Sequence, residues 1–172
     1  MTMTHQLLTQ LFALLALGLV MFVELGLGYF PAFHGVAPKL MLTWLYLMLV
    51  YDEEPPRLIS LFMLGIIYDS LEGNPLGYTS GALILVAISG HIAHGQTSHL
   101  FRPPLSSLWI TFAFVMLVGF AYSVGVMLAY YQTMPAVGYV LFQYAATVLL
   151  FPLVLGAQQS ARRLSAFLRG TP

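Results

Sequence analysis

Two carboxylates near the ends of apolar runs are the first candidates for chemistry in this sequence. Glu24 lies about one helical turn before the end of the first run, and Asp69 lies at the end of the third. Together with His34 and Glu72 they make a candidate polar site on one side of a membrane. Carboxylates there can relay protons, bind a cation or bind a substrate amine. The commoner use is structural: Asp69 would accept backbone N–H groups in its own turn, and Glu24 would pair with Lys39 or His34.

Three histidines have a spacing that permits metal binding. His91 and His94 are three residues apart, on one face of a predicted helix, and His99 follows in a loop. Imidazoles at this spacing can bind zinc. The nearest carboxylates belong to other segments, however, and the H-E-x-x-H pattern is absent. We therefore interpret the histidines as interfacial side chains favoured by a helix dipole, and we predict no metal site and no cofactor.

The sequence contains no recognised catalytic motif. G-x-S-x-G, Walker A and G-x-G-x-x-G patterns are absent. The chain also has no cysteine, which excludes a disulfide framework and a thiol nucleophile. Its formal net charge is zero, so no basic surface for nucleic acid is expected. We predict a protein that is not an enzyme and does not bind nucleic acid.

Residues 65–78 place one of these carboxylates beside a sharp turn. An apolar run ends near Asp69, and Gly73, Asn74, Pro75 and Gly77 follow within a few residues. Glycine permits positive φ values, and proline fixes φ, as tight turns require. An unpartnered carboxylate in a membrane is costly. The segment is therefore predicted to combine a helix end, an acidic group and a hairpin turn.

The composition indicates an integral membrane protein. Of the 172 residues, 59% are hydrophobic and 7% are charged, whereas an average soluble domain has about 25% charged residues. The first apolar run has neither a basic segment before it nor a small-residue cleavage site. We therefore expect it to be a retained membrane span and not a signal peptide.

Sparse charges and turn residues divide the chain into six apolar segments. A bilayer core of about 30 Å needs roughly 20 helical residues. We predict one all-α domain over residues 1–172, with a short basic tail at 160–172. Its spans are predicted at about 7–29, 37–51, 57–71, 76–94, 105–131 and 136–159. The second and third segments are short, so they either extend into the flanking loops or form a membrane-buried hairpin.

The distribution of basic residues predicts the orientation. With six spans, five of the six basic side chains lie on one side: Arg57, Arg102, Arg162, Arg163 and Arg169. Lys39 lies on the other side. Because basic residues favour cytoplasmic loops, both termini are predicted to be cytoplasmic. The turn at residues 69–77 then faces outward.

Residues 65–77 resemble the signature of the rod shape-determining MreD family, a G-x-x-x-D-x-x-x-G-x-P-x-G pattern between the third and fourth spans. The matching positions are Gly65, Asp69, Gly73, Pro75 and Gly77. The chain length, the six predicted spans and the acidic, proline-containing turn before the third span are also similar. The histidines and the arginine-bearing tail are not part of the pattern.

The resemblance implies a non-enzymatic scaffold in the bacterial inner membrane that maintains rod shape during peptidoglycan synthesis. Its expected partners are the lipid bilayer and MreC, with RodA, a class B penicillin-binding protein, RodZ and MreB in the larger elongation complex. The family is similar in fold to the six-helix substrate-binding components of energy-coupling-factor transporters. The alternative function is therefore a small-solute or vitamin-binding component of such a transporter. A solute binder should enclose polar and aromatic side chains in an outer cavity, whereas a scaffold should have an apolar groove open to lipid.

Overall fold

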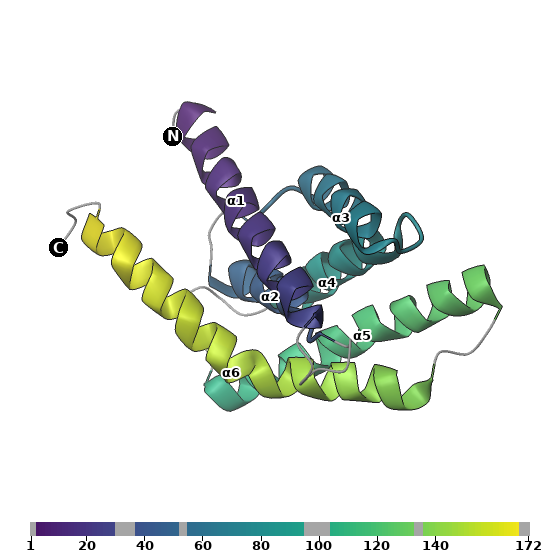
Figure 1. Ribbon diagram of the computed structural model, residues 1–172. Helices are drawn as coiled ribbons and strands as arrows, with labels where there is room; N and C mark the ends of the chain where they lie inside the picture. The colour runs from purple at the N-terminus through teal and green to yellow at the C-terminus, as the bar shows by residue number, and fades with distance from the viewer. Residues whose placement is uncertain (1–2, 30–36, 52–54, 95–103, 133–135, 169–172) are drawn as a thin grey trace.

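Six α-helices and no strand make up the part of the chain that the computed structural model describes, residues 3–29, 37–51, 55–94, 104–132 and 136–168 (Figure 1). Side chains are described for residues 10–29, 37–51, 55–93, 104–132 and 136–161. The helices are α1 (Met3–Gly28), α2 (Leu40–Tyr51), α3 (Leu58–Glu72), α4 (Tyr78–His94), α5 (Leu105–Tyr131) and α6 (Val137–Leu168). The prediction of an all-α chain is confirmed.

Three of the described helices are long and apolar enough to cross a membrane. The qualifying stretches are Gln10–Gly28, Leu105–Tyr131 and Val137–Ala161, in α1, α5 and α6. Helices α2, α3 and α4 have 12, 15 and 17 residues, or about 18 to 26 Å, which is less than the bilayer core of about 30 Å. The six-span topology therefore stays a prediction. Helix α6 also continues to Leu168, into the segment predicted as a tail.

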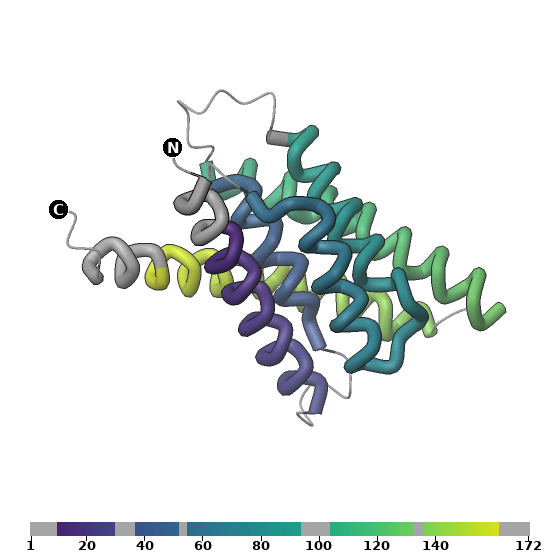
Figure 2. Tube along the Cα trace, turned by 90° about the horizontal axis from the view of Figure 1, so that it is seen from above, coloured from purple at the N-terminus to yellow at the C-terminus, as the bar shows by residue number. Residues whose placement is uncertain are grey.

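Helices α2 and α4 each lie among three other helices. Helix α2 packs against α1, α4 and α6, while α4 packs against α2, α3 and α5 (Figures 1 and 2). Every residue of α2 except Thr43 is hydrophobic, and seven of its twelve residues are buried: Met41, Leu42, Thr43, Leu45, Tyr46, Leu47 and Met48. A helix that is apolar on all sides is stable where other helices surround it. This explains how the shortest helix can pack among three others.

An aromatic cluster joins α2, α5 and α6 in the core. The rings of Phe112 and Phe151 stack with centroids 4.4 Å apart, and the ring of Tyr46 lies 5.2 Å from Phe112 and 6.1 Å from Phe151. All three side chains are fully buried. The Tyr46 hydroxyl donates a hydrogen bond to the Leu108 carbonyl, with 3.2 Å between the oxygens. The tyrosine ring is therefore buried while its hydroxyl keeps a hydrogen bond.

Pro152 interrupts the hydrogen-bond ladder of α6, and α5 compensates for the interruption. Proline has no N–H, so the carbonyl four residues earlier loses its helical donor. That carbonyl belongs to Val148, and it accepts a hydrogen bond from the indole N–H of Trp109 at 2.9 Å. The bond ties α6 to the first half of α5 at the point where the α6 backbone has a free acceptor.

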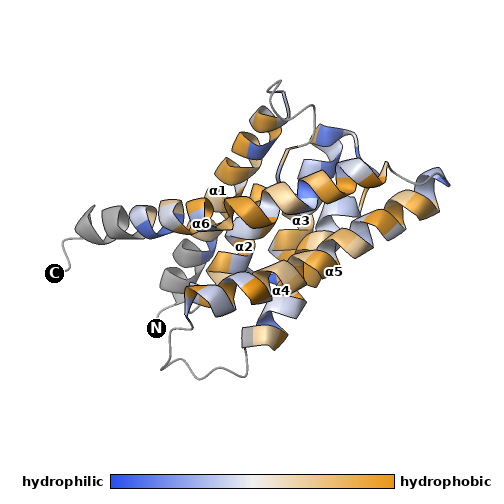
Figure 3. Ribbon diagram, turned by 90° about the horizontal axis from the view of Figure 1, so that it is seen from below, coloured by the Kyte–Doolittle hydropathy of each residue, from blue (hydrophilic) through white to orange (hydrophobic). Residues whose placement is uncertain are grey.

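The outer faces of the helices are apolar. On α3, Ile59, Met63 and Ile67 are more than half exposed and recur at helical spacing. Hydrophobic residues cover most of the length of the helices, as on α5 (Figure 3). Such a continuous apolar surface is costly in water and favourable in lipid, so it agrees with a membrane protein.

Candidate functional site at the turn between α3 and α4

Asp69 caps α4 from the end of α3. Its side chain is fully buried. Carboxylate Oδ2 accepts the Gly77 N–H at 2.9 Å, and Oδ1 accepts the Thr79 N–H at 2.8 Å. The first N–H groups of a helix have no partner within the helix, and a negative charge is favoured there. Asp69 satisfies one of these donors, at Thr79, and the N–H of Gly77 just before α4, and so joins the two helices.

The turn between the helices uses the backbone freedom of two glycines. Gly73 ends α3 with φ +72°, and Gly77 has φ +99°. Both values lie where a side chain is strongly disfavoured. The backbone N–H groups of Gly73 and Asn74 donate to the Asp69 carbonyl, so the same residue organises the turn through its main chain as well. Pro75 lies buried between the glycines.

Gly65 allows α3 and α4 to approach closely, one turn before Asp69. A Cβ atom at residue 65 would overlap the Cα and backbone N of Ser80. Both obstructing atoms belong to the α4 backbone, so a side-chain rotation could not relieve the overlap. The five positions that match the family pattern, Gly65, Asp69, Gly73, Pro75 and Gly77, thus all lie in one helix hairpin. We call this hairpin, with its Asp69 hydrogen bonds, the Asp69 clasp.

A second polar group, the Glu24–Lys39 cluster, lies between α1, α2 and α3. It consists of Glu24, Lys39, Tyr68 and Glu72. Glu24 is 1% exposed, and its carboxylate accepts hydrogen bonds from the Tyr68 hydroxyl and the Met41 N–H, each at 2.8 Å. The Lys39 ammonium lies 3.3 Å from Glu24 Oε1. The buried carboxylate is therefore paired and hydrogen-bonded, as a charge in an apolar protein must be.

Lys39 connects the largest number of elements in this cluster. Its Nζ atom lies 3.6 Å from Glu72 Oε2, 3.2 Å from the Tyr68 hydroxyl and 5.0 Å from the centre of the Tyr68 ring. Its backbone N–H donates to Thr147 Oγ1 on α6 at 3.0 Å. Gln143, one turn earlier on α6, donates to the Ala37 carbonyl. The segment that precedes α2 is thus held by α1, α3 and α6 together.

The structure divides the predicted polar site into two parts. Glu24 and Glu72 both contact Lys39, whereas Asp69 bonds to its own turn. His34 lies outside the described residues, as do His99 and the side chain of His94, and His91 is exposed. Among the side chains that can be placed, no three His, Asp or Glu residues come close enough to hold a metal ion.

Sequence reasoning missed Tyr68, Thr147 and Gln143 as members of the polar network. Each lies within an apolar run, where a single polar side chain does not change the hydropathy pattern of the sequence. Lys39, the only lysine in the chain, indicates carboxylate partners, and the structure places Glu24 and Glu72 beside it. It gives no signal for a tyrosine, a threonine or a glutamine.

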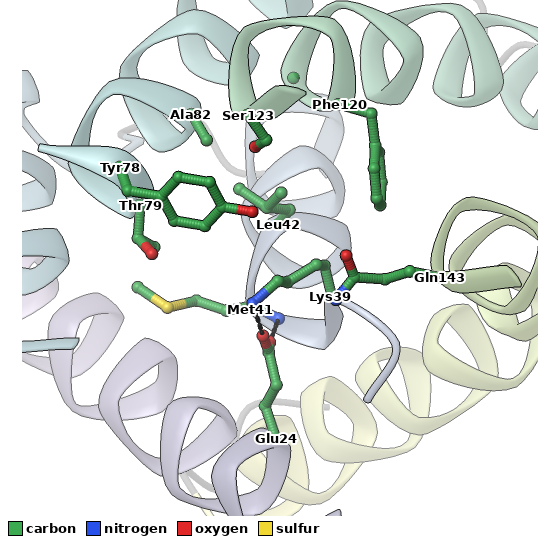
Figure 4. Close-up of a pocket in the computed structure, with 11 residues that line it drawn as sticks. Glu24, Lys39, Met41, Leu42, Tyr78, Thr79, Ala82, Phe120, Ser123 and Gln143 are labelled. Atoms are coloured by element: carbon green, nitrogen blue, oxygen red, sulfur yellow. Dashed lines mark hydrogen bonds and ion pairs between the residues drawn. The ribbon is translucent and has the colours of Figure 1, made fainter. Parts of the chain in front are cut away.

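A small cavity borders the Glu24–Lys39 cluster. Its volume is about 20 Å³, and polar side chains that line it include Glu24, Lys39, Tyr78, Thr79, Ser123 and Gln143 (Figure 4). A volume of roughly 10 to 15 Å³ holds one water molecule. A groove of about 130 Å³ between α5, α6 and the start of α4 adjoins it, and the two share the lining residues Tyr78, Phe120, Ser123 and Gln143. The cavity can hold a polar group no larger than about one water molecule.

Comparison with known proteins gives no assignment. No protein-family model matches the chain, and no curated protein and no solved structure matches it.

Proposed function

We propose that this protein is a non-enzymatic membrane scaffold of the bacterial cell-wall elongation complex, of the MreD type. The observation that carries the proposal is the Asp69 clasp. Every position of the G-x-x-x-D-x-x-x-G-x-P-x-G pattern has a physical reason in this hairpin: close packing at Gly65, capping at Asp69 and positive φ at Gly73 and Gly77. Pro75 is buried in the turn.

The arrangement of the ionisable groups also favours a structural role. The carboxylates of Glu24 and Asp69 accept hydrogen bonds from other groups of the protein. The Lys39 ammonium forms ion pairs with two carboxylates. Such bonds fix the positions of helices. A site for acid–base chemistry would instead direct a carboxylate or ammonium into a cavity large enough for substrate.

A vitamin-binding role has less support because of volume. Sites for molecules of the size of a vitamin commonly enclose roughly 300 to 1,000 Å³. The polar cavity beside Lys39 measures about 20 Å³, and the groove that adjoins it about 130 Å³. A hollow of about 390 Å³ lies at the other end of α2, beside Tyr51, Leu105 and Gln159, and is open and not enclosed. We therefore rank the transporter component below the scaffold.

In the proposed role the chain lies in the bacterial inner membrane with six spans and both termini in the cytoplasm. MreC is the first partner, and RodA, a class B penicillin-binding protein, RodZ and MreB belong to the larger complex. The support for membrane embedding is the apolar character of α1, α5 and α6. Partner helices would pack on the exposed apolar faces, where lipid otherwise lies.

Co-purification from the organism of origin tests this proposal. The tagged chain is extracted in a mild detergent, and MreC is measured in the purified fraction by immunoblotting. We expect the ratio of MreC to the tagged chain to stay constant through repeated washing. An unrelated multi-span protein with the same tag should retain no MreC. Absence of MreC from an intact, monodisperse preparation would contradict the proposal.

A further inference from the structure

The groove between α5, α6 and the start of α4 is half polar. Four of its eight lining side chains carry a hydroxyl or an amide: Tyr78, Ser123, Tyr139 and Gln143. Tyr139 is 53% exposed, so the groove reaches the surface of the helix bundle near the starts of α4 and α6. The groove adjoins the cavity that borders the Glu24–Lys39 cluster (Figure 4). The two spaces together extend from the surface to this cluster.

The polar side chains shared by the groove and the cavity have hydrogen-bonding capacity to spare. Among the described residues, the Tyr78 and Ser123 hydroxyls form no hydrogen bond, and Gln143 uses only its Nε2 atom, which donates to the Ala37 carbonyl. In Figure 4 these side chains, from α4, α5 and α6, point into one space. A polar group that is removed from water costs free energy unless it is hydrogen-bonded. A hydrocarbon chain in this space would leave these groups unpaired.

The Lys39 ammonium has an N–H group available for a further acceptor. An ammonium has three N–H groups. The Tyr68 hydroxyl and Glu24 Oε1 lie within hydrogen-bond distance of Lys39 Nζ, at 3.2 and 3.3 Å. The Glu72 Oε2 atom, at 3.6 Å, is too far away to accept a hydrogen bond. Since Lys39 lines the cavity, an acceptor there can use the remaining N–H.

The size and charge of the cavity select water as its occupant. The volume of about 20 Å³ is close to the roughly 10 to 15 Å³ that one water molecule needs. The Lys39 ammonium disfavours a cation beside it, and the carboxylates of Glu24 and Glu72, which outnumber the ammonium, disfavour an anion. A water molecule both donates and accepts, as the mixture of an ammonium, hydroxyls and an amide oxygen requires.

We propose that water fills the groove and the cavity and hydrates the buried Glu24–Lys39 ion pair. One water molecule occupies the cavity and accepts the remaining N–H of Lys39, and water in the groove connects it to the surface. The ion pair is thereby in contact with solvent at the end of the bundle that carries the turn between α3 and α4. The proposal does not rest on the scaffold role, because it concerns the chain without partners.

Cysteine accessibility tests whether the groove contains water. The chain has no cysteine, so a single one can be placed at Ser123, which lines both the groove and the cavity. The matched controls are Ala121→Cys and Gly125→Cys. Both control positions are exposed, and each lies two residues from Ser123, which is about 3 Å along α5 and on its opposite side. The three cysteines are therefore compared at similar depth in the membrane.

Each variant is placed in lipid nanodiscs and treated with aminoethyl methanethiosulfonate, a water-soluble thiol reagent, and the labelled fraction is followed by mass spectrometry. We expect Ser123→Cys to react roughly tenfold faster than either control, the effect of one pKa unit on the fraction of reactive thiolate. Equal reaction rates at the three positions would overturn the proposal.

A bulky residue in the groove tests the route of the water. Met127 is the groove residue nearest the end of α5, and Met127→Trp, combined with Ser123→Cys, should slow labelling towards the rate of the controls. Ala129→Trp adds an indole at an exposed position on α5 and should leave the labelling rate unchanged. An unchanged rate with Met127→Trp would contradict entry through the groove.

The contact between water and Lys39 can be measured in the unmodified protein. Because Lys39 is the only lysine, labelling lysine with an NMR-active nitrogen isotope gives one side-chain and one backbone signal. Solid-state NMR in lipid bilayers then measures how fast magnetisation passes from water to each nitrogen. We expect faster transfer to Nζ than to the backbone nitrogen, whose N–H is bonded to Thr147. Transfer to Nζ that is no faster would show a dry ion pair and overturn the proposal.

Discussion

The buried carboxylate of Asp69 acts on two helices at once. It lies in the last turn of α3, and its two oxygens accept N–H groups at the start of α4. A cap supplied by a neighbouring helix fixes the relative position of both helices, which a cap within one helix cannot do. The carboxylate therefore matters chiefly as a double acceptor.

Replacement of Asp69 distinguishes hydrogen bonding from charge. Asp69→Asn keeps one acceptor oxygen and should retain most of the fold. Asp69→Leu leaves the Gly77 and Thr79 N–H groups without this partner, and we expect a loss of about 1 to 3 kcal/mol for each. Thermal unfolding of the detergent-purified variants measures the difference. If Asn and Leu proved equally harmful to function in stably folded protein, the charge itself would be functional, as in a proton relay.

Gly65 offers a second test of the hairpin between α3 and α4. Gly65→Ala places a methyl group against the Ser80 backbone, and we expect a destabilisation of about 1 to 3 kcal/mol from overpacking. The matched control is Gly18→Ala on α1, where nothing lies within 4 Å of the added Cβ. The control should be neutral or slightly stabilising, because alanine favours a helix. Equal effects of the two substitutions on the unfolding midpoint would rule out the close helix approach.

At the scale of the helices, the Glu24–Lys39 cluster holds α1, α2 and α3 together, and the Lys39 backbone adds α6 through Thr147. Helix α2 is short and apolar on all sides, so its own sequence gives it no preferred rotation among its neighbours. Specific polar contacts at Lys39, just before α2, and at Met41 in its first turn supply that preference.

Removal of Lys39 tests the cluster. Lys39→Met leaves the Glu24 carboxylate buried without its cation, and we expect a loss of about 3 to 5 kcal/mol. The double variant with Glu24→Gln removes the unpaired charge and should recover at least half of that loss. A double-mutant cycle on unfolding midpoints measures the coupling. Additive losses would show that the two side chains do not interact.

The sequence predicted the helix ends better than the contacts between helices. Gly73, Pro75 and Gly77 indicated the turn because their backbone preferences are local. The Gly65 approach to Ser80 and the Tyr68 bond to Glu24 depend on which helix faces come together, and no local pattern contains that information. Tyr68 also has the same spacing as its apolar neighbours, so only the folded structure identifies it as a polar contact.

At the scale of the molecule, the apolar outer surface and three long helices indicate a membrane environment, and the topology can be measured directly. We expect a periplasm-dependent reporter fused to the C-terminus to be inactive and a cytoplasmic reporter to be active, because five of six basic residues fall on one side of the six-span topology. Activity of the periplasmic reporter at the C-terminus would refute that topology.

Cell shape tests the proposed scaffold role in cell-wall elongation. The gene is depleted in the organism of origin, and cell width is measured with wild-type, Gly65→Ala or Gly18→Ala protein supplied in its place. We predict that depleted cells lose their rod shape, that wild-type protein restores it, and that Gly65→Ala restores it less well than Gly18→Ala. Depleted cells that keep their normal width and rod shape would contradict the proposed role.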